Sequence, residues 1–223
     1  MWTGSDGIAK IELLHTMGDD LMVVNAARVS FNKESKMMTG GDAKLIKYLA
    51  DHNHVTPFFH PQLQFRIKMP IFVAREWYRH QIGFARNEVS RRYVDSEPEC
   101  YIPDPENIRA RDSNKKQGSK DTPVEQSDAA YEMMSSAVSV AMTEYKSLLS
   151  IGVAPEIARM VLPQSMYTEF IETGSLAAYA RLYKLRHDPH AQKEIRDYAD
   201  AIGSLIAEKF PFSWSALTKR EDA

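Results

Sequence analysis

The sequence has little cysteine and no long apolar run, and both absences narrow the classes of protein to consider. Cys100 is the one cysteine among 223 residues, so no internal disulfide can form. No stretch of about eighteen apolar residues occurs, and residues 1–10 (MWTGSDGIAK) contain no apolar signal core. Membrane spans and secretion are therefore not expected, and we predict a cytoplasmic protein with no membrane partner.

The chain also lacks a strong net charge and the common nucleotide-binding loops. Its formal net charge is −2, which argues against a general binder of polyanions such as nucleic acid polymers. It contains no Gly-x-Gly-x-x-Gly, no Walker loop and no Gly-x-Ser-x-Gly turn. Recognition of phosphate must therefore come from a concentrated site of another design.

The composition is otherwise that of an ordinary globular protein. Of the 223 residues, 43% are hydrophobic and 26% are charged, which is enough for a sizeable core. We predict a single domain over residues 1–223. Residues 103–126 are mostly polar and contain no aromatic residue, so we predict a surface loop or lid there rather than a domain boundary.

The N-terminal half shows the patterns of strands as well as helices. Apolar and polar residues alternate in 62–69 (QLQFRIKM), which predicts a half-buried strand. A first strand is expected at 8–14. The expected helices are 21–31, capped by Asp19 or Asp20, 43–51 after a break at Gly40 and Gly41, and 70–81 with Pro70 at its first position.

The C-terminal half is predicted to be helical. Apolar residues recur at intervals of three and four between Tyr131 and Leu148, which indicates a long amphipathic helix ending near Gly152. Further helices are expected from Pro155 to a stop at Pro163, over 176–186 with Ser175 as cap, and from Asp188-Pro189 with an apolar stripe between Ala191 and Leu205.

These elements together predict an α+β fold of α/β type. The expected architecture is an antiparallel-containing sheet flanked by long helices in a single domain. The apolar stripe of each helix can be buried within the chain or at a subunit interface, and internal packing is the first expectation.

A cluster of basic residues stands out in RHQIGFARNEVSRRY, residues 79–93. It holds four arginines and one glutamate, so its like charges repel one another unless an anion binds between them. The planar guanidinium of arginine binds phosphate and the carbonyl-imide edge of a pyrimidine at two points, which lysine cannot do. The cluster therefore predicts a mononucleotide site, with a solvated basic face as the alternative.

The residues on either side extend this cluster. If 70–81 is a helix, Glu76, Arg79 and His80 share one face, because they are three and four positions apart. A simple surface ion pair is also compatible with that spacing. Downstream, Glu88 and Ser90 offer acceptor and donor groups to a ribose or a base.

Three histidines, His52, His54 and His60, lie close together in the sequence without predicting a metal site. No carboxylate or cysteine joins them at a familiar ligand spacing. We expect His54 and Thr56 to border a pocket and His52 to lie on the surface.

The stretch REWYRHQ followed by RNEVSRRY resembles the signature of flavin-dependent thymidylate synthases, usually R-H-R, about five residues, then N-E-x-S-x-R-Y. The resemblance runs through most of the chain in separate blocks that keep the family order. The blocks are NAARVSF (25–31), HVTPF (54–58), MPIFVAREWYRH (69–80), IARMVLP (157–163) and LRHDPHAQ (185–192).

The resemblance implies a homotetramer with FAD sites between subunits. It also implies conversion of dUMP to dTMP, with 5,10-methylenetetrahydrofolate as carbon donor and NADPH as reductant. Arg186 is implied to be catalytic, because its permanent charge at the pyrimidine edge favours ionisation of N3. The implied dUMP contacts are Glu76, Trp77, Tyr78, Arg79, Glu88, Val89, Ser90, Arg91, Arg92, Arg159 and Arg186.

The implied flavin contacts follow the same blocks, with His54 bordering both flavin and folate. Gln81 stands where the family has the second Arg of R-H-R, and one extra residue separates it from Asn87. Ser175-Leu176-Ala177 replaces an Asn-x-Arg, while Arg181 stands where Asn is usual. The implied flavin contacts are Ser30, His54, Thr56, Arg79, His80, Gln81, Glu88, Ser175 and Arg181.

The cysteine content agrees with this resemblance. Cys100 has no neighbouring His or Lys that would lower the pKa of its thiol, so it is not expected to be a nucleophile. Reduced flavin supplies the hydride in such enzymes, and no enzyme nucleophile is required. The alternative from another class is a non-catalytic nucleotide- or RNA-binding module that keeps the arginine cluster.

Overall fold

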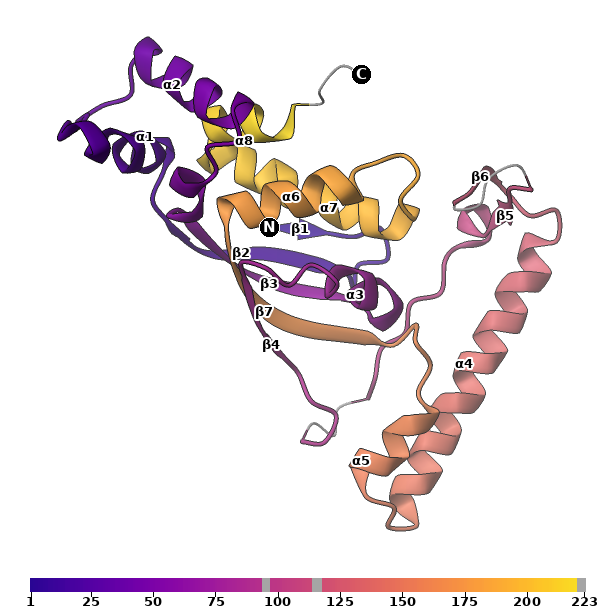
Figure 1. Ribbon diagram of the computed structural model, residues 1–223. Helices are drawn as coiled ribbons and strands as arrows, with labels where there is room; N and C mark the ends of the chain where they lie inside the picture. The colour runs from indigo at the N-terminus through magenta and orange to yellow at the C-terminus, as the bar shows by residue number, and fades with distance from the viewer. Residues whose placement is uncertain (94–96, 114–117, 220–223) are drawn as a thin grey trace.

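The computed structural model describes residues 1–93, 97–113 and 118–219, and a five-stranded antiparallel sheet lies at its centre (Figure 1). The strand order β1-β2-β3-β7-β4 makes neighbours of distant segments, and β3 pairs with β7 from Gln62 opposite Ser175 to Pro70 opposite Tyr167. The strands are β1 Trp2–Thr3, β2 Lys10–Met17, β3 Gln62–Pro70, β4 Phe84–Glu88 and β7 Tyr167–Ser175.

Helices cover one face of this sheet and one end of it (Figure 1). α6 and α7 lie against the face, and α8 packs beside them next to α1 and α2. The helices are α1 Asp20–Arg28, α2 Gly40–Asp51, α3 Ile71–Trp77, α4 Ser127–Ser150, α5 Pro155–Ala158, α6 Leu176–Arg186, α7 Lys193–Lys209 and α8 Pro211–Thr218, with 3₁₀ turns η1 Val29–Phe31, η2 Thr56–Phe59, η3 Pro105–Asn107 and η4 Arg159–Val161.

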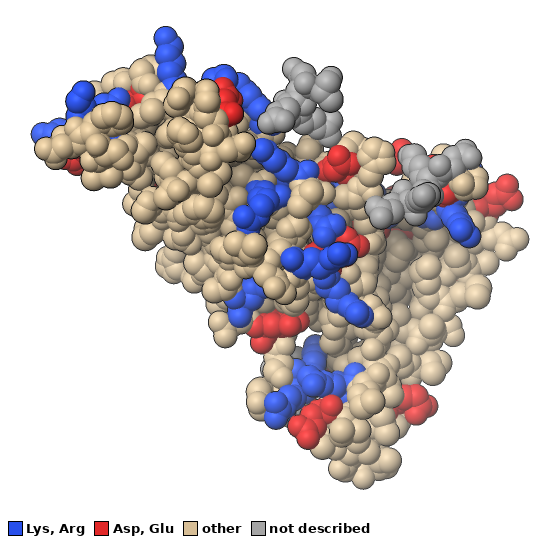
Figure 2. All heavy atoms as spheres, in the orientation of Figure 1, with Lys and Arg blue, Asp and Glu red and all other residues tan. Residues whose placement is uncertain are grey.

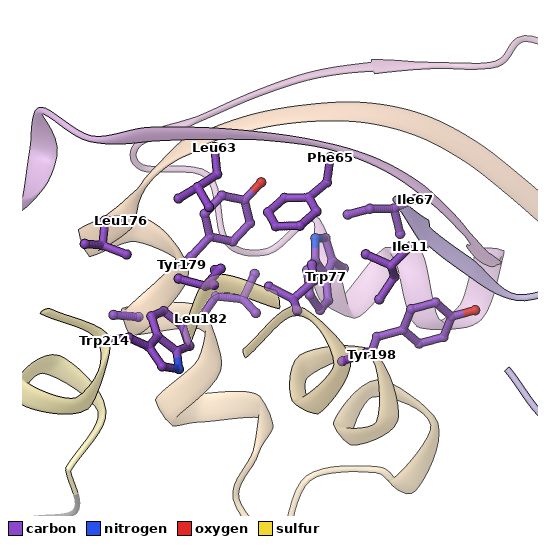
Figure 3. Close-up of a cluster of buried hydrophobic side chains, with 14 of the residues drawn as sticks. Ile11, Leu63, Phe65, Ile67, Trp77, Leu176, Tyr179, Leu182, Tyr198 and Trp214 are labelled. Carbon is purple, nitrogen blue, oxygen red and sulfur yellow. The ribbon is translucent and has the colours of Figure 1, made fainter. Parts of the chain in front are cut away.

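The core lies between β3 and the helices (Figure 3). Leu63, Phe65 and Ile67 of β3 are fully buried, as their alternation with polar residues predicts. Phe65 meets the ring of Tyr179 from α6 edge to face, with centroids 5.3 Å apart. Burying each such side chain stabilises the fold by about 1.5–3 kcal/mol, so β3 and α6 are held firmly together.

The fold class is confirmed, but the sequence pattern does not predict every strand. β7 carries Glu172 on the side that faces the core, opposite Phe65 in the register, and this buried carboxylate breaks the alternation expected of a half-buried strand. β4 does the same with Arg86, which lies opposite Glu172. This polar pair hides β7 and the edge strand β4 from pattern reasoning.

Several predicted helix boundaries are wrong. Gly40 and Gly41 form the first turn of α2, whose N-cap is Thr39 in a reciprocal capping box with Asp42. Pro70 ends β3 and is the N-cap of α3, which stops at Trp77 instead of residue 81. α7 begins at Lys193 rather than at Asp188-Pro189.

The long helix α4 is confirmed and forms an arm that extends away from the sheet (Figure 1). It ends before Gly152, whose φ of +90° suits glycine. In the described part of 103–126, where a surface loop or lid is predicted, the chain forms η3 and the two short strands β5 Arg109–Arg111 and β6 Ser119–Pro123. Within the described ranges, no helix is long and apolar enough to span a membrane.

Candidate functional site

Arg186, the last residue of α6, reaches the end of α3 with all three guanidinium nitrogens engaged. Its Nε donates to Nε2 of His80 at 2.9 Å, and its Nη2 donates to the carbonyl oxygen of Glu76 at 3.1 Å. Its Nη1 lies 3.2 Å from the Glu76 carboxylate. The fold thus joins two predicted site segments that are far apart in the sequence.

His80 is held in its neutral form at this position. Burial lowers its pKa to about 4, and the nearby positive charges of Arg186 and Arg86 act in the same direction. A neutral imidazole can accept the hydrogen bond from Arg186, whereas an imidazolium cannot. Burial also lowers the pKa of Arg186, although a guanidinium remains charged under these conditions.

Glu76, Arg79 and His80 lie close together, but they do not share the helical face that the sequence predicts. The helix ends at Trp77, and Arg79 and His80 follow in a turn where their amides donate to the carbonyls of Glu76 and Trp77. This turn keeps Glu76, Arg79 and His80 within one region. Gln81, which comes next, is exposed.

Arg186 lines a pocket of about 680 Å³, and most of the charged side chains in this pocket are basic. Figure 2 shows basic side chains gathered over the region of α3 and α6, with acidic ones among them. Five Lys and Arg side chains and two acidic ones line the pocket: Arg79, Arg109, Arg186, Lys193 and Arg196, with Glu76 and Asp121. Such a surplus of positive charge favours an anionic ligand.

A second pocket, of about 420 Å³, is lined by five further predicted substrate contacts. It lies between the chain after β4 and the turn η4, and Glu88, Val89, Ser90, Arg91 and Arg159 line it. Nearby, the Nε of Arg92 lies 3.4 Å from the Glu156 carboxylate. Arg159 and Arg186 therefore line different pockets of the described chain.

Glu88 and Tyr78 are anchored to the sheet beside these pockets. The Glu88 carboxylate accepts a hydrogen bond from the Thr168 hydroxyl at 2.5 Å. Tyr78 is half-buried and meets the Phe170 ring edge to face, at 5.0 Å between centroids. Burial and the Glu88 carboxylate raise the pKa of the Tyr78 phenol, so it stays protonated as a hydrogen-bond donor.

A third pocket, of about 840 Å³, unites three predicted flavin residues from two separate motifs. Ser30, His54 and Thr56 all line it, together with Tyr48 of α2. His54 meets the Tyr48 ring edge to face, at 6.0 Å between centroids. His52, expected on the surface, is exposed, and its ring lies against that of Tyr48 at a tilt of 30°, with centroids 4.0 Å apart.

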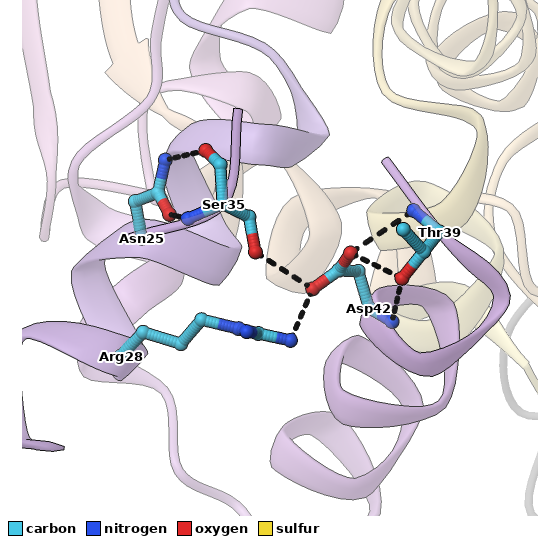
Figure 4. Close-up of polar contacts among 5 residues, drawn as sticks. All are labelled: Asn25, Arg28, Ser35, Thr39 and Asp42. Carbon is cyan, nitrogen blue, oxygen red and sulfur yellow. Dashed lines mark hydrogen bonds and ion pairs between the residues drawn. The ribbon is translucent and has the colours of Figure 1, made fainter. Parts of the chain in front are cut away.

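A polar network around the buried Asp42 holds the segment that carries Ser30 (Figure 4). Asn25 exchanges two hydrogen bonds with the backbone of Ser35, at 2.9 and 2.7 Å. The buried Asp42 accepts from Thr39, Ser35 and Arg28, the last at 2.5 Å. Hydrogen bonds from Thr39 are the main cause that lowers the pKa of Asp42, so this carboxylate stays charged and keeps the network intact.

The arginine cluster is partly neutralised by carboxylates that lie far away in the sequence. Arg86 forms an ion pair with Glu172 of β7, whose side chain is fully buried. The indole of Trp77 donates to both oxygens of Glu172, at 3.2 and 3.1 Å. Burial raises the pKa of Glu172, which Arg86 opposes. Sequence reasoning misses Glu172 because an isolated acid in a strand carries no motif.

Comparisons with known proteins agree with the fold and these motifs. Residues 12–212 match the family model described as thymidylate synthase complementing protein. A flavin-dependent thymidylate synthase of Thermosipho africanus is 42% identical over 210 residues, which cover 94% of this chain and 90% of the relative. The chain belongs to the flavin-dependent thymidylate synthase family.

Two further matches support this membership. A flavin-dependent thymidylate synthase of Thermus thermophilus is 40% identical over 207 residues, covering 93% of this chain and 74% of the relative. The crystal structure of a UMP/dUMP methylase, PolB of Streptomyces cacaoi, bound with 5-Br dUMP has a TM-score of 0.85 and 32% identity over 94% of each chain. The predicted family is confirmed, and so is the prediction that the chain is an enzyme of this family. The alternative prediction, a non-catalytic nucleotide- or RNA-binding module, is not confirmed.

Two residues that the family resemblance implies as ligand contacts are buried. Trp77 is fully buried beneath Glu172, and Ser175 is 2% exposed with its hydroxyl accepting from the amide of Ala178. Within this chain, both support the site from the core: Trp77 fixes α3 and Ser175 caps α6.

Arg181 lies beside the turn that carries the changed family motif. Its Nη2 donates to the carbonyl of Ile82 at 2.5 Å, just after Gln81. Gly83 has a φ of +84° there, and an added Cβ would meet the Ala178 side chain at 3.0 Å. Arg181 therefore places a positive charge near Gln81, the position at which the family resemblance implies an arginine.

Cys100 is partly buried, and burial raises the pKa of its thiol, which agrees with a role in packing. Among residues 1–93, 97–113 and 118–219, no group of three or more His, Cys, Asp or Glu side chains is arranged to hold a metal ion.

Proposed function

We propose that this protein methylates dUMP to dTMP in the cytoplasm, with FAD as cofactor, 5,10-methylenetetrahydrofolate as carbon donor and NADPH as reductant. The observation that carries the proposal is the position of Arg186. Its guanidinium contacts a neutral imidazole and the Glu76 carboxylate, which lie more than a hundred residues away in the sequence, and Arg186 and Glu76 line a basic pocket. Family membership supports the same reaction.

The chemistry of Arg186 suits a pyrimidine whose N3 loses a proton. A guanidinium presents parallel N–H donors to the carbonyl-imide edge, and its fixed positive charge stabilises the anion that forms. His80 and Glu76 hold the guanidinium plane, so little reorganisation is needed when the base binds. Neutral His80 adds no competing positive charge at this position.

The third pocket has the groups that a flavin requires. Ser30 and Thr56 provide hydroxyls and His54 provides a ring, while Phe31 and Val55 leave apolar surface exposed beside them. A flat aromatic ring system binds well between apolar walls with a few polar groups at its edge. The bound flavin would supply the electron-transfer chemistry, and these side chains would orient it and exclude water.

A homotetramer with shared active sites would bring the separate pockets together. α4 has one buried residue, Tyr145, while Met133 and Val140 on the same helix are 74% and 59% exposed. At the end of the arm, Ile157 and Met160 are 55% and 77% exposed beside Arg159. Exposed apolar surface of this kind marks protein interfaces, so the arm is a candidate to carry the second pocket to a neighbouring subunit.

The proposed contacts follow from this arrangement. Arg186 is the proposed catalytic residue, and no metal takes part. The proposed dUMP contacts are Glu76, Tyr78, Arg79, Glu88, Val89, Ser90, Arg91, Arg92, Arg159 and Arg186, with Trp77 supporting them from the core. The proposed flavin contacts are Ser30, His54, Thr56, Arg79, His80, Gln81, Glu88 and Arg181, with Ser175 supporting them as a helix cap.

Anaerobic turnover tests this function. Purified protein loaded with FAD is mixed with dUMP, 5,10-methylenetetrahydrofolate and NADPH, and dTMP is measured by chromatography. We expect dTMP in the complete mixture and none when dUMP or the folate is left out. NADPH alone should bleach the visible flavin band. A protein that takes up no FAD, or that forms no dTMP, contradicts the proposal.

A further inference from the structure

The pocket around Arg186 holds a basic residue to which the motifs assign no role. Arg196 lies in the first turn of α7 and lines this pocket, which also contains Arg79. Its Nε is buried and has no hydrogen-bond partner among the described residues. The Nε of Arg196 thus has no acceptor within the described chain.

Three of the other four Lys and Arg side chains of the pocket have carboxylate partners. Nη2 of Arg109 donates to both oxygens of Glu194, at 2.7 and 2.9 Å. Lys193 lies 2.8 Å from Asp197, and Arg186 contacts Glu76. Within the described chain, neither Arg79 nor Arg196 has an ion pair. The uncompensated charge of the pocket therefore lies on these two arginines.

The start of α7 adds to this positive potential. Its N-cap, Gln192, makes no capping hydrogen bond with its side chain, and Gln192 and Lys193 both line the pocket. The first amides of a helix point outward with a partial positive charge and favour an anion. Glu194 is the one acid in that turn, and its carboxylate is already held by Arg109.

We propose that Arg196 and the first turn of α7 form an oxyanion subsite within the Arg186 pocket, which takes a phosphate or carboxylate group of a substrate. The inference rests on the proposed function in one respect, because the oxyanion is assigned to a substrate of that reaction. Three groups share this chemistry: the dUMP phosphate, the phosphates of NADPH and the glutamate carboxylates of the folate.

Calorimetric titration with inorganic pyrophosphate at low salt tests the subsite without any turnover. The wild type should bind pyrophosphate, and Arg196→Gln should bind it about tenfold or more weakly, because a charge-assisted hydrogen bond is lost. Arg196→Lys, which keeps the charge but not Nε, should fall between them. Arg66→Gln is the matched control: Arg66 lies on β3, is half exposed and does not line the pocket.

The same variants identify the substrate whose phosphate or carboxylate group binds to the subsite. Dissociation constants of the wild type and both variants are measured for dUMP, NADPH and p-aminobenzoylglutamate. The natural group belongs to the ligand whose binding is weakened by Arg196→Gln but not by Arg66→Gln. Equal pyrophosphate binding by Arg196→Gln and wild type overturns the subsite, and unchanged binding of all three ligands overturns its assignment to a substrate. If pyrophosphate binding depends on Arg196 but no dTMP is ever formed, the proposed function fails and the subsite stands.

Discussion

Two arginine–glutamate pairs occupy different surroundings in this molecule. Arg86 and Glu172 meet across β4 and β7, where the side chain of Glu172 is 0% exposed. Arg186 and Glu76 meet at the ends of α6 and α3, where the carboxylate side chain is 33% exposed and opens onto a pocket. The chemical groups are the same, but the first pair is enclosed by protein and the second faces a site.

The contrast shows why Arg186 can serve a ligand and Arg86 cannot. Both oxygens of Glu172 are taken up by Trp77 and Arg86, and Arg86 lies against the rings of Phe84 and Tyr78, 4.8 and 5.3 Å from their centroids. Arg186 instead shares its donors among a neutral imidazole, a backbone carbonyl and one carboxylate. We infer that the first pair maintains the fold and the second performs chemistry.

The largest expected effect tests the enclosed pair. Glu172→Ala should lower the free energy of unfolding by about 3–5 kcal/mol, because Arg86 and the Trp77 indole lose their buried partner. Denaturant unfolding followed by circular dichroism measures it. The double variant Arg86→Met, Glu172→Leu should recover part of the loss, because apolar side chains replace the ion pair but leave the Trp77 indole without its acceptor. A loss below about 1 kcal/mol for the single variant contradicts the structural role.

The pocket pair should respond in the opposite way. Arg186→Ala should remove about 2–4 kcal/mol of transition-state stabilisation, seen as a large fall in kcat/KM for dTMP formation. Its unfolding midpoint should stay near that of the wild type, because the side chain borders a pocket rather than the core. Near-normal turnover by this variant would exclude Arg186 as the catalytic residue.

A third carboxylate, Asp42, lies between these extremes. It is 1% exposed but belongs to the network that supports the Ser30 segment. Asp42→Asn should cost about 1–3 kcal/mol of stability, measured by thermal unfolding, and should weaken FAD binding. Since its folded pKa is lowered, its contribution is present above the ordinary value of 3.8 and is lost as the pH falls through the folded value.

The exposed helix pair Lys47 and Asp51 provides the control for Asp42. Asp51→Asn should leave both the unfolding midpoint and FAD binding unchanged, because an exposed ion pair contributes little. Equal effects of the two substitutions would mean that the network in Figure 4 does not support the pocket.

The smallest expected effect concerns the titration of His80, which contacts Arg186 of the pocket pair. His80 should titrate near pH 4 rather than near its ordinary 6.5, which NMR of the imidazole carbons can follow, with His80→Gln to assign the signal. Because the unfolded chain takes up this proton first, stability should decrease as the pH falls from about 6.5 toward 4. Half-protonation near pH 6.5 would show that Arg186 does not face a neutral imidazole.

The family and the main chemical groups follow from the sequence itself. The blocks around Arg79, Glu88 and Arg186 identify the family, because each motif is local and its residue types are specific to the chemistry. β3, α4 and α6 are predicted for a similar reason, since alternation, helical spacing and a Ser175 cap are visible within one segment.

The tertiary structure alone decides which of these side chains serve a ligand. Glu172 neutralises Arg86 from a strand 86 positions away. This pairing conceals β7 from pattern reasoning and makes one arginine of the predicted mononucleotide cluster part of the core. Arg196 shows the converse, because it belongs to no motif and still lines the Arg186 pocket without a partner. Burial and charge compensation depend on contacts between distant segments, and a linear sequence does not contain that information in any single stretch.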